Sequence, residues 1–221
     1  MLKTDREIAE AVVDELRWDT RIDAHAIEVR VDRGGVTMVG SVCSWAERLA
    51  AQEAAQRVAG VHDVSNRIEV ALERDAQCTD AELAQAVRTA LDWDVFLPKK
   101  IIASSVSAGQ VMLEGEVECC PQRDEAERAV RNIRGVRRVL NRILVKPTLG
   151  EAYQVQKSIE AALERRAARG ACRINLDVHD GKVILSGVVN SWAERQWVVG
   201  AAKGTLGVRS VDDRLSIELP R

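Results

Sequence analysis

The chain has 221 residues, of which 30% are charged and 46% are hydrophobic, and its formal net charge is −2. This nearly neutral charge excludes the strongly basic type of nucleic-acid-binding protein. No run approaches the roughly 20 apolar residues of a membrane-spanning helix, and the N-terminus lacks the apolar stretch of a signal peptide. We therefore expect a soluble protein of the cytoplasm.

A threefold internal repeat organises the whole sequence. Residues 60–68 read GVHDVSNRI, and the segment returns as GVRRVLNRI at 135–143 and as GVRSVDDRL at 207–215. Adding 75 or 147 to a first-repeat position gives its counterparts, with no gap inside a repeat. The repeat predicts three domains, residues 1–74, 75–147 and 148–221. The joints between them are expected at residues 73–78 and 146–150.

Each repeat begins with a predicted helix. In the first repeat, Ile8, Val12 and Leu16 recur four residues apart on one helical face. The spacing of threonine and glutamate predicts capping boxes at residues 4–7 and 79–82. The third repeat has Glu151 at the cap position, which predicts a weaker helix start, and its helix is expected to continue to Leu163.

Two strands follow the helix, over residues 27–31 and 36–42 in the first repeat. A glycine that suits the positive φ of a tight hairpin turn stands between them in every repeat, as Gly34, Gly109 and Gly181. A second glycine lies inside the second strand, as Gly40, Gly115 and Gly187. Because glycine weakens a strand, this position indicates a bulge or a close approach, either by a helix of the same unit or by a ligand.

A second helix and a third strand complete the repeat. Ser44 and Glu47 predict another capping box, and the stripe of alanines behind them would let the helix lie close to the sheet. Glycines predicted as αL C-caps end this helix, as Gly60, Gly135 and Gly207. The predicted fold class is α+β, with three tandem α-β-β-α-β units, each a three-stranded mixed sheet with two helices on one face. We expect neighbouring units to pack on the open face of a sheet.

The glycines and valines at 34, 36, 40 and 42, followed by Gly60-Val61-x-x-Val64-x-Asn66, resemble the BON domain. The family takes its name from the bacterial osmotically inducible periplasmic protein Y and from nodulation-specificity proteins. The resemblance covers nearly the whole chain three times, and the third copy departs most, with Asp213 in place of the asparagine. It implies attachment of bacterial proteins to phospholipid membranes, and one relative binds potassium. It supplies no catalytic residue.

The sequence predicts no catalytic, cofactor or metal site. The five cysteines occupy unrelated repeat positions and form no zinc-binding spacing. The adjacent Cys119 and Cys120 are incidental thiols, a soft-metal site or a strained disulfide. None of the three histidines recurs between repeats, and no nucleophile elbow, phosphate loop or dinucleotide fingerprint is present.

The candidate contacts with lipid or a partner are aromatic and basic. Trp192 and Trp197 are either anchors at a membrane interface or the edge of a small core. Phe96, in the apolar loop 95–98, contacts either a neighbouring repeat or a lipid or partner. A basic run suits anionic headgroups, or forms a solvated face balanced by nearby acids; it comprises Arg128, Arg131, Arg134, Arg137 and Arg138.

These observations favour a non-enzymatic bacterial protein of the osmotic or general stress response. We expect it to contact an anionic phospholipid surface or envelope-associated proteins, and not nucleic acid. A cytoplasmic sensor of a small ion such as potassium, and a protein-interaction scaffold, are the alternatives.

Overall fold

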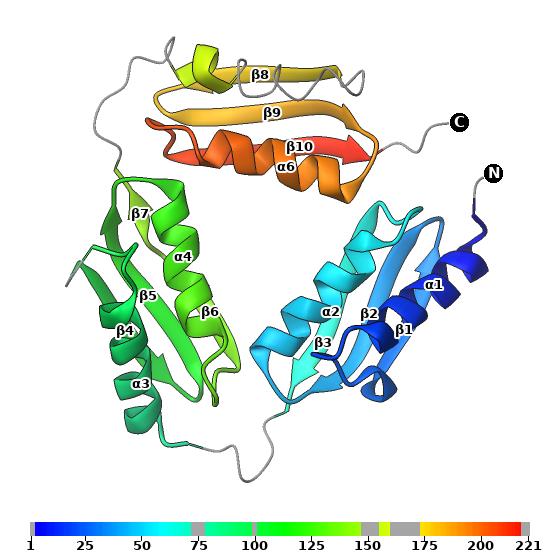
Figure 1. The fold of residues 1–221 in the computed structure, drawn as a ribbon, viewed down its shortest axis with the longest axis horizontal. Coiled ribbons are helices and arrows are strands. Elements are labelled where there is room, and N and C mark those ends of the chain that lie inside the picture. Colours follow the sequence, from blue (N-terminus) through cyan, green and yellow to red (C-terminus); the bar gives the residue numbers. More distant parts are fainter. Residues whose placement is uncertain (1–2, 72–77, 99–100, 147–154, 160–172, 218–221) are drawn as a thin grey trace.

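The structure is a computed structural model that describes residues 3–71, 78–98, 101–146, 155–159 and 173–217. It contains three units of similar fold, which we call units one, two and three in chain order (Figure 1). Most of the two predicted joints lies outside the described residues. In the first helix of unit three, residues 155–159 are described and are helical. The predicted continuation of this helix to Leu163 lies outside the described residues.

Unit one has the predicted order of elements. Its central strand β2 runs antiparallel to β1 and parallel to β3, so the sheet is mixed. The elements are α1 (Asp5–Trp18), the short 3-10 helix η1 (Ala24–Ala26), β1 (Ile27–Asp32), β2 (Gly35–Val42), α2 (Trp45–Arg57) and β3 (Asp63–Val70).

Units two and three repeat this topology. Unit two comprises α3 (Asp80–Trp93), β4 (Ile102–Ser107), β5 (Gln110–Val117), α4 (Cys120–Arg131), β6 (Arg138–Asn141) and β7 (Leu144–Val145). Unit three comprises β8 (Arg173–His179), β9 (Lys182–Val189), α6 (Trp192–Lys203) and β10 (Ser210–Ile217). The repeat predicts the last strand of unit two as one strand over residues 136–145, but the strand is interrupted at residues 142–143. Both parts pair in parallel with β5.

The core of each unit lies between its helices and one face of its sheet. In unit one, Val12 of α1, Met38 of β2 and Ala54 of α2 are all fully buried in one cluster. The opposite face carries exposed residues such as Glu28, Arg30 and Ser41. The prediction of two helices on one face of a three-stranded sheet is confirmed.

The cap predictions are confirmed for the first helices. The side chains of Thr4 and Thr79 each accept the third amide of the helix, and Glu7 and Glu82 bond back to the cap residues. The prediction for the second helix is half right. Ser44 accepts the Glu47 amide, but the Glu47 carboxylate accepts N–H groups outside the box, at Asp23 and Cys43.

The hairpin turns are also as predicted. Gly34, Gly109 and Gly181 have φ values of 74, 76 and 76°, and the residue before each also has a positive φ. Two consecutive positive φ values define a type I′ turn, whose twist matches that of the strands. The Asp5 carboxylate accepts the N–H groups of Arg33 and Gly34, both at 2.9 Å, and so fastens this turn to the start of α1.

Backbone does approach the strand glycines closely, as expected, in the two units where the neighbouring atoms are described. The approaching group is neither one of the two α-helices of the unit nor a ligand; at Gly40 it is the last residue of the short helix η1. A Cβ atom at Gly40 would collide with the carbonyl oxygen of Ala26, and one at Gly115 with that of Ile101. Both carbonyls belong to the backbone just before the first strand of the same unit. Gly187 shares the positive φ, at 127°.

The C-cap prediction for Gly60, Gly135 and Gly207 needs correction. Their φ values of 104, 97 and 91° are positive, as expected. The second helices end earlier, however, and their C-cap residues are Val58, Asn132 and Gly204. The glycines lie in the following turn. A Cβ atom at Gly60 would lie 2.9 Å from Cδ1 of Ile8, so this glycine lets α1 approach the turn.

Candidate functional site

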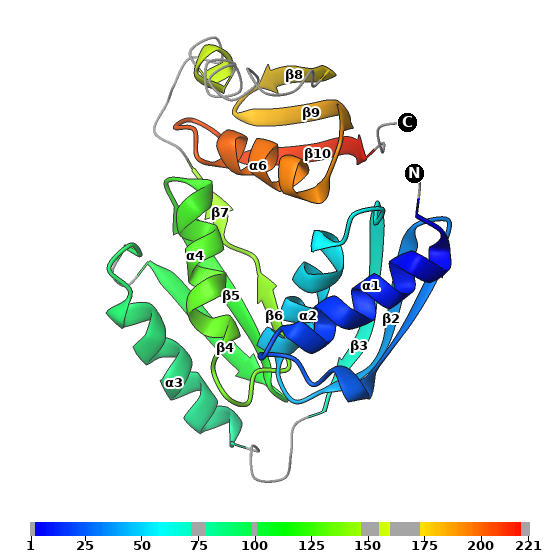
Figure 2. The same cartoon turned by 45° about the vertical axis from the view of Figure 1, so that its right-hand side comes forward.

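The three units meet through their second helices, and not through the open faces of the sheets as expected. Helices α2, α4 and α6 face the middle of the molecule, with the sheets behind them (Figures 1 and 2). Packing two polar sheet faces together would remove little apolar surface from water. The first residues of the second helices include large apolar side chains, and contact with a neighbouring unit removes these from water.

One repeat position makes each of these contacts. Its three occupants are Trp45, Cys120 and Trp192, the first residue of each second helix. Trp45 packs against the combined core of units two and three, and Trp192 packs against the core of unit one. The Sγ atom of Cys120 lies 3.5 Å from the carbonyl oxygens of Val208 and Arg209 in unit three. Each unit therefore contacts the next, and unit three returns to unit one.

The tryptophans at this position are not free membrane anchors. The Nε1 atoms of Trp45 and Trp192 are buried and have no hydrogen-bond partner among the described residues. An arginine three residues later covers each ring, with guanidinium carbons 4.8 Å and 4.9 Å from the ring centroids for Arg48 and Arg195. Trp197 is half-buried and packs against the combined core of units two and three. Trp192 therefore connects two units.

The cysteine at this position is sequestered. Cys120 is fully buried, and burial raises the pKa of its thiol, which keeps it protonated as a donor to the two carbonyls. Cys43, Cys78, Cys119 and Cys120 form no disulfide with one another. Cys172 lies outside the described residues. Among those residues, no group of three His, Cys, Asp or Glu side chains is placed to hold a metal ion.

The aromatic loop of unit two is exposed. The side chains of Trp93, Val95 and Phe96 are 82%, 92% and 76% exposed, whereas Leu97 is buried and anchors the loop. The Phe96 amide donates to the Asp94 carboxylate at 2.8 Å, which shapes the chain into a turn. Since Phe96 is so exposed, the alternative in which it packs on a neighbouring repeat is wrong.

The basic run is divided by its surroundings. Arg128 is paired with Glu125 one helical turn away, and Arg131 is half-buried rather than exposed as expected. Arg134 and Arg138 are exposed. The pKa of Arg48 in unit one is lowered first by burial and then by the positive charge of Arg138, so the start of β6 is locally basic next to unit one.

The basic and aromatic candidates do not form one patch. The backbone oxygen of Arg134 accepts from Sγ of Cys78, which lies just before the start of α3. Phe96 follows the other end of α3, a helix of 14 residues. At 1.5 Å per residue, the two sites are about 20 Å apart.

Comparison with known proteins identifies the repeat. The family profile of the BON domain matches residues 4–71, 79–147 and 153–218. The chain belongs to the BON domain family. Among the described residues of this BON-domain protein, none of the helices is both long and apolar enough to cross a membrane.

One curated relative and several solved structures are similar to the chain. Osmotically-inducible protein Y of Escherichia coli (strain K12) is 30% identical over 127 residues, which are 54% of this chain and 62% of that protein. The match thus spans less than two thirds of the relative. The C-terminal domain of CdsD, a structural protein of the type III secretion system of Chlamydia trachomatis, aligns with 98% of this chain and all of that chain, at 13% identity and a TM-score of 0.27. The periplasmic domain of PrgH from S. typhimurium aligns with 88% of this chain and 95% of that chain, also at 13% identity, with a TM-score of 0.23.

Proposed function

We propose that this BON-domain protein is a non-catalytic protein of the osmotic or general stress response that attaches to phospholipid surfaces. The observation that carries the proposal is the exposure of Trp93, Val95 and Phe96 together at one end of unit two. Contiguous exposed apolar side chains mark interaction sites, and tryptophan favours the membrane–water interface. The relation to osmotically-inducible protein Y supports the stress context.

The size of this apolar site suits reversible attachment. Full burial of a large apolar side chain is worth about 1.5–3 kcal/mol, so three of them would hold the protein weakly on a membrane. Asp92 and Asp94 precede the loop in the sequence and Lys99 and Lys100 follow it, so these charges sum to zero. We therefore expect insertion to depend little on anionic lipid. The exposed Arg134 and Arg138 would add about 1 kcal/mol each only if the opposite end of α3 also met an anionic surface.

Vesicle co-sedimentation tests the proposal. The intact protein is expected to bind neutral phosphatidylcholine vesicles, and the triple variant Trp93→Ser, Val95→Ser, Phe96→Ser is expected to lose binding. Leu206→Ser is a matched control, because Leu206 is 84% exposed but belongs to unit three. Equal binding by the triple variant and the intact protein would contradict the role of the loop.

A second arm separates the two candidate contacts. Anionic vesicles and the variant Arg134→Glu, Arg138→Glu test the basic end, whose contribution should fall as salt rises. If neither vesicle type is bound, a protein partner or a small ion becomes the better explanation, and equilibrium dialysis against potassium tests the latter. The expected cytoplasmic location remains a prediction, which cell fractionation tests.

A further inference from the structure

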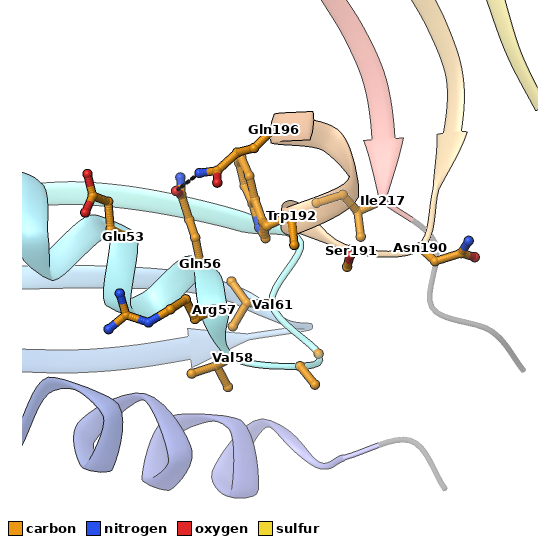
Figure 3. A pocket seen from close by; sticks show the side chains of 13 residues that line it. Glu53, Gln56, Arg57, Val58, Val61, Asn190, Ser191, Trp192, Gln196 and Ile217 are labelled. Atoms are coloured by element: carbon orange, nitrogen blue, oxygen red, sulfur yellow. Dashed lines mark hydrogen bonds between the residues drawn. The ribbon is translucent and has the colours of Figure 1, made fainter. Parts of the chain in front are cut away.

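A cavity lies where unit three returns to unit one. Its volume is about 410 Å³, within the range typical of small-molecule sites, which often lie between domains. Figure 3 shows the end of α2 on one side and the start of α6 on the other, with Gln196 Nε2 donating to Gln56 Oε1 at 3.3 Å across the joint.

The floor of the cavity is apolar. Val58 and Val61 come from the end of α2 and the turn after it, Trp192 from the start of α6, and Ile217 from the end of β10. Val58 and Val61 are 9% and 2% exposed, so a bound molecule would rest mainly on the half-buried Trp192 and Ile217 of unit three and would touch unit one at the edges of the two valines. Such a surface favours a ligand with a flat or branched apolar body.

The charged groups at the cavity differ in their availability. Arg57 is already engaged, with Nε 2.8 Å from Glu15 and a second nitrogen 3.2 Å from Asp19. The nearest cation to Glu53 is Arg21, at 3.8 Å, and the Glu53 side chain is 42% exposed. The Glu53 carboxylate is therefore less engaged in ion pairs than the Arg57 guanidinium. It can accept a further positively charged partner, so the cavity favours a cation over an anion.

The joint beside the cavity differs in its side chains from the joint between units two and three. Where unit two meets unit three, the smaller Cys120 contacts two carbonyls directly, and Lys203 Nζ lies 2.7 Å from Asp124 Oδ2. Where unit three meets unit one, the same repeat positions carry the larger Trp192 and the neutral pair Gln56 and Gln196. The joint between units three and one thus combines a bulky aromatic side chain with a neutral hydrogen-bonded pair.

We propose that this cavity binds a small organic cation with an apolar body, and that the bound cation holds unit three against unit one. The apolar lining takes the body of the ligand, and the carboxylate of Glu53, at the edge of the cavity, attracts its charge. No peptide link joins unit three directly to unit one, so a ligand that contacts both stabilises the closed arrangement by mass action. This site is separate from the exposed loop proposed to contact phospholipid.

Dye binding by the full-length protein tests the proposal. The probes are the cation thioflavin T, the neutral N-phenyl-1-naphthylamine and the anion 1-anilinonaphthalene-8-sulfonate. We expect saturable binding of thioflavin T at one site and no competition by the anion. Ala193→Phe, which places a ring in the cavity, should weaken thioflavin T binding at least tenfold. Its matched control is Ala81→Phe, because Ala81 is also exposed at the second position of a helix.

The charge preference has its own variant. Glu53→Gln should weaken thioflavin T binding about two- to fivefold, the range of a partly exposed ion pair, while binding of the neutral dye stays the same. Because Glu53 is partly exposed, this variant should fold even if Ala193→Phe does not. Absence of thioflavin T binding, or equal binding by the intact protein and a folded Ala193→Phe variant, would overturn the site. An equal effect of Glu53→Gln on both dyes would overturn the proposed cation.

Discussion

The Nζ atom of Lys203 lies 2.7 Å from Oδ2 of Asp124, and this ion pair joins α6 of unit three to α4 of unit two. The same two repeat positions meet again where unit three contacts unit one, as the hydrogen-bonded Gln56 and Gln196. In each contact a residue near the start of one second helix, Asp124 or Gln196, meets a residue near the end of another, Lys203 or Gln56. Head-to-tail contacts of this kind form a closed ring when the rotation between units returns to the start.

Reversing one charge of this ion pair should weaken the joint between units two and three. Lys203 and Asp124 are about one-third exposed, so we expect Lys203→Asp to lower the free energy of unfolding by about 0.2–1 kcal/mol. Adding Asp124→Lys should restore most of the loss, and urea unfolding of all four proteins gives the coupling. A double variant no more stable than either single variant would show that the pair contributes nothing.

Replacing Gly115 with valine should destabilise unit two. The new Cβ atom would collide with the backbone oxygen of Ile101, and the φ of 146° is unfavourable for a branched residue. Overpacking of this kind costs about 1–3 kcal/mol, which a lower thermal midpoint would report.

Gly200 provides the contrasting case. It lies inside α6, and no described atom other than the helix's own backbone lies within 4 Å of a Cβ placed there. Gly200→Ala should therefore stabilise the protein by about 0.5–1 kcal/mol, because alanine loses less backbone entropy in a helix. If both glycine variants shifted the midpoint in the same direction, local crowding would not explain either.

Acid should weaken unit one through Asp19. Its side chain is 10% exposed, and hydrogen bonds from Arg21 and then from Arg57 hold the pKa of its carboxyl well below the usual value. A folded-state pKa lower than the unfolded one gives stability that is present above about pH 4 and is lost as the pH falls further. The free energy of unfolding of the intact protein should therefore drop below pH 4, and Asp19→Asn should remove part of that drop. An identical acid profile for the variant would contradict this role.

Truncating Trp192 should loosen the joint between units three and one. The side chain is half-buried against the core of unit one, so Trp192→Ala should cost about 1–3 kcal/mol, below the value for a fully buried tryptophan. Trp192→Phe should cost less, because the indole N–H that it removes has no partner among the described residues. Trp18→Ala is the control, since Trp18 is 83% exposed. Equal losses for Trp192→Ala and Trp18→Ala would exclude a contact specific to the joint.

Local order in this protein follows from the sequence. The capping threonines Thr4 and Thr79, the turn glycines such as Gly34 and the alternating strand residues act over a few positions, where steric limits on φ and short hydrogen bonds decide the conformation. Because the threefold repeat has no gaps, a conformation inferred at one position applies to the equivalent positions of the other two units. For these reasons the α-β-β-α-β order and the mixed sheet were predictable.

Contacts between distant segments were decided only by the tertiary structure. The sequence marked Gly40 as a place of close approach but could not show that the approaching atom is the carbonyl oxygen of Ala26. It grouped Trp192 with Phe96 as aromatic candidates, yet Trp192 packs on unit one while Phe96 faces solvent. Such contacts depend on how whole surfaces fit in shape and charge, and the same side chain is buried or exposed according to what the fold brings next to it.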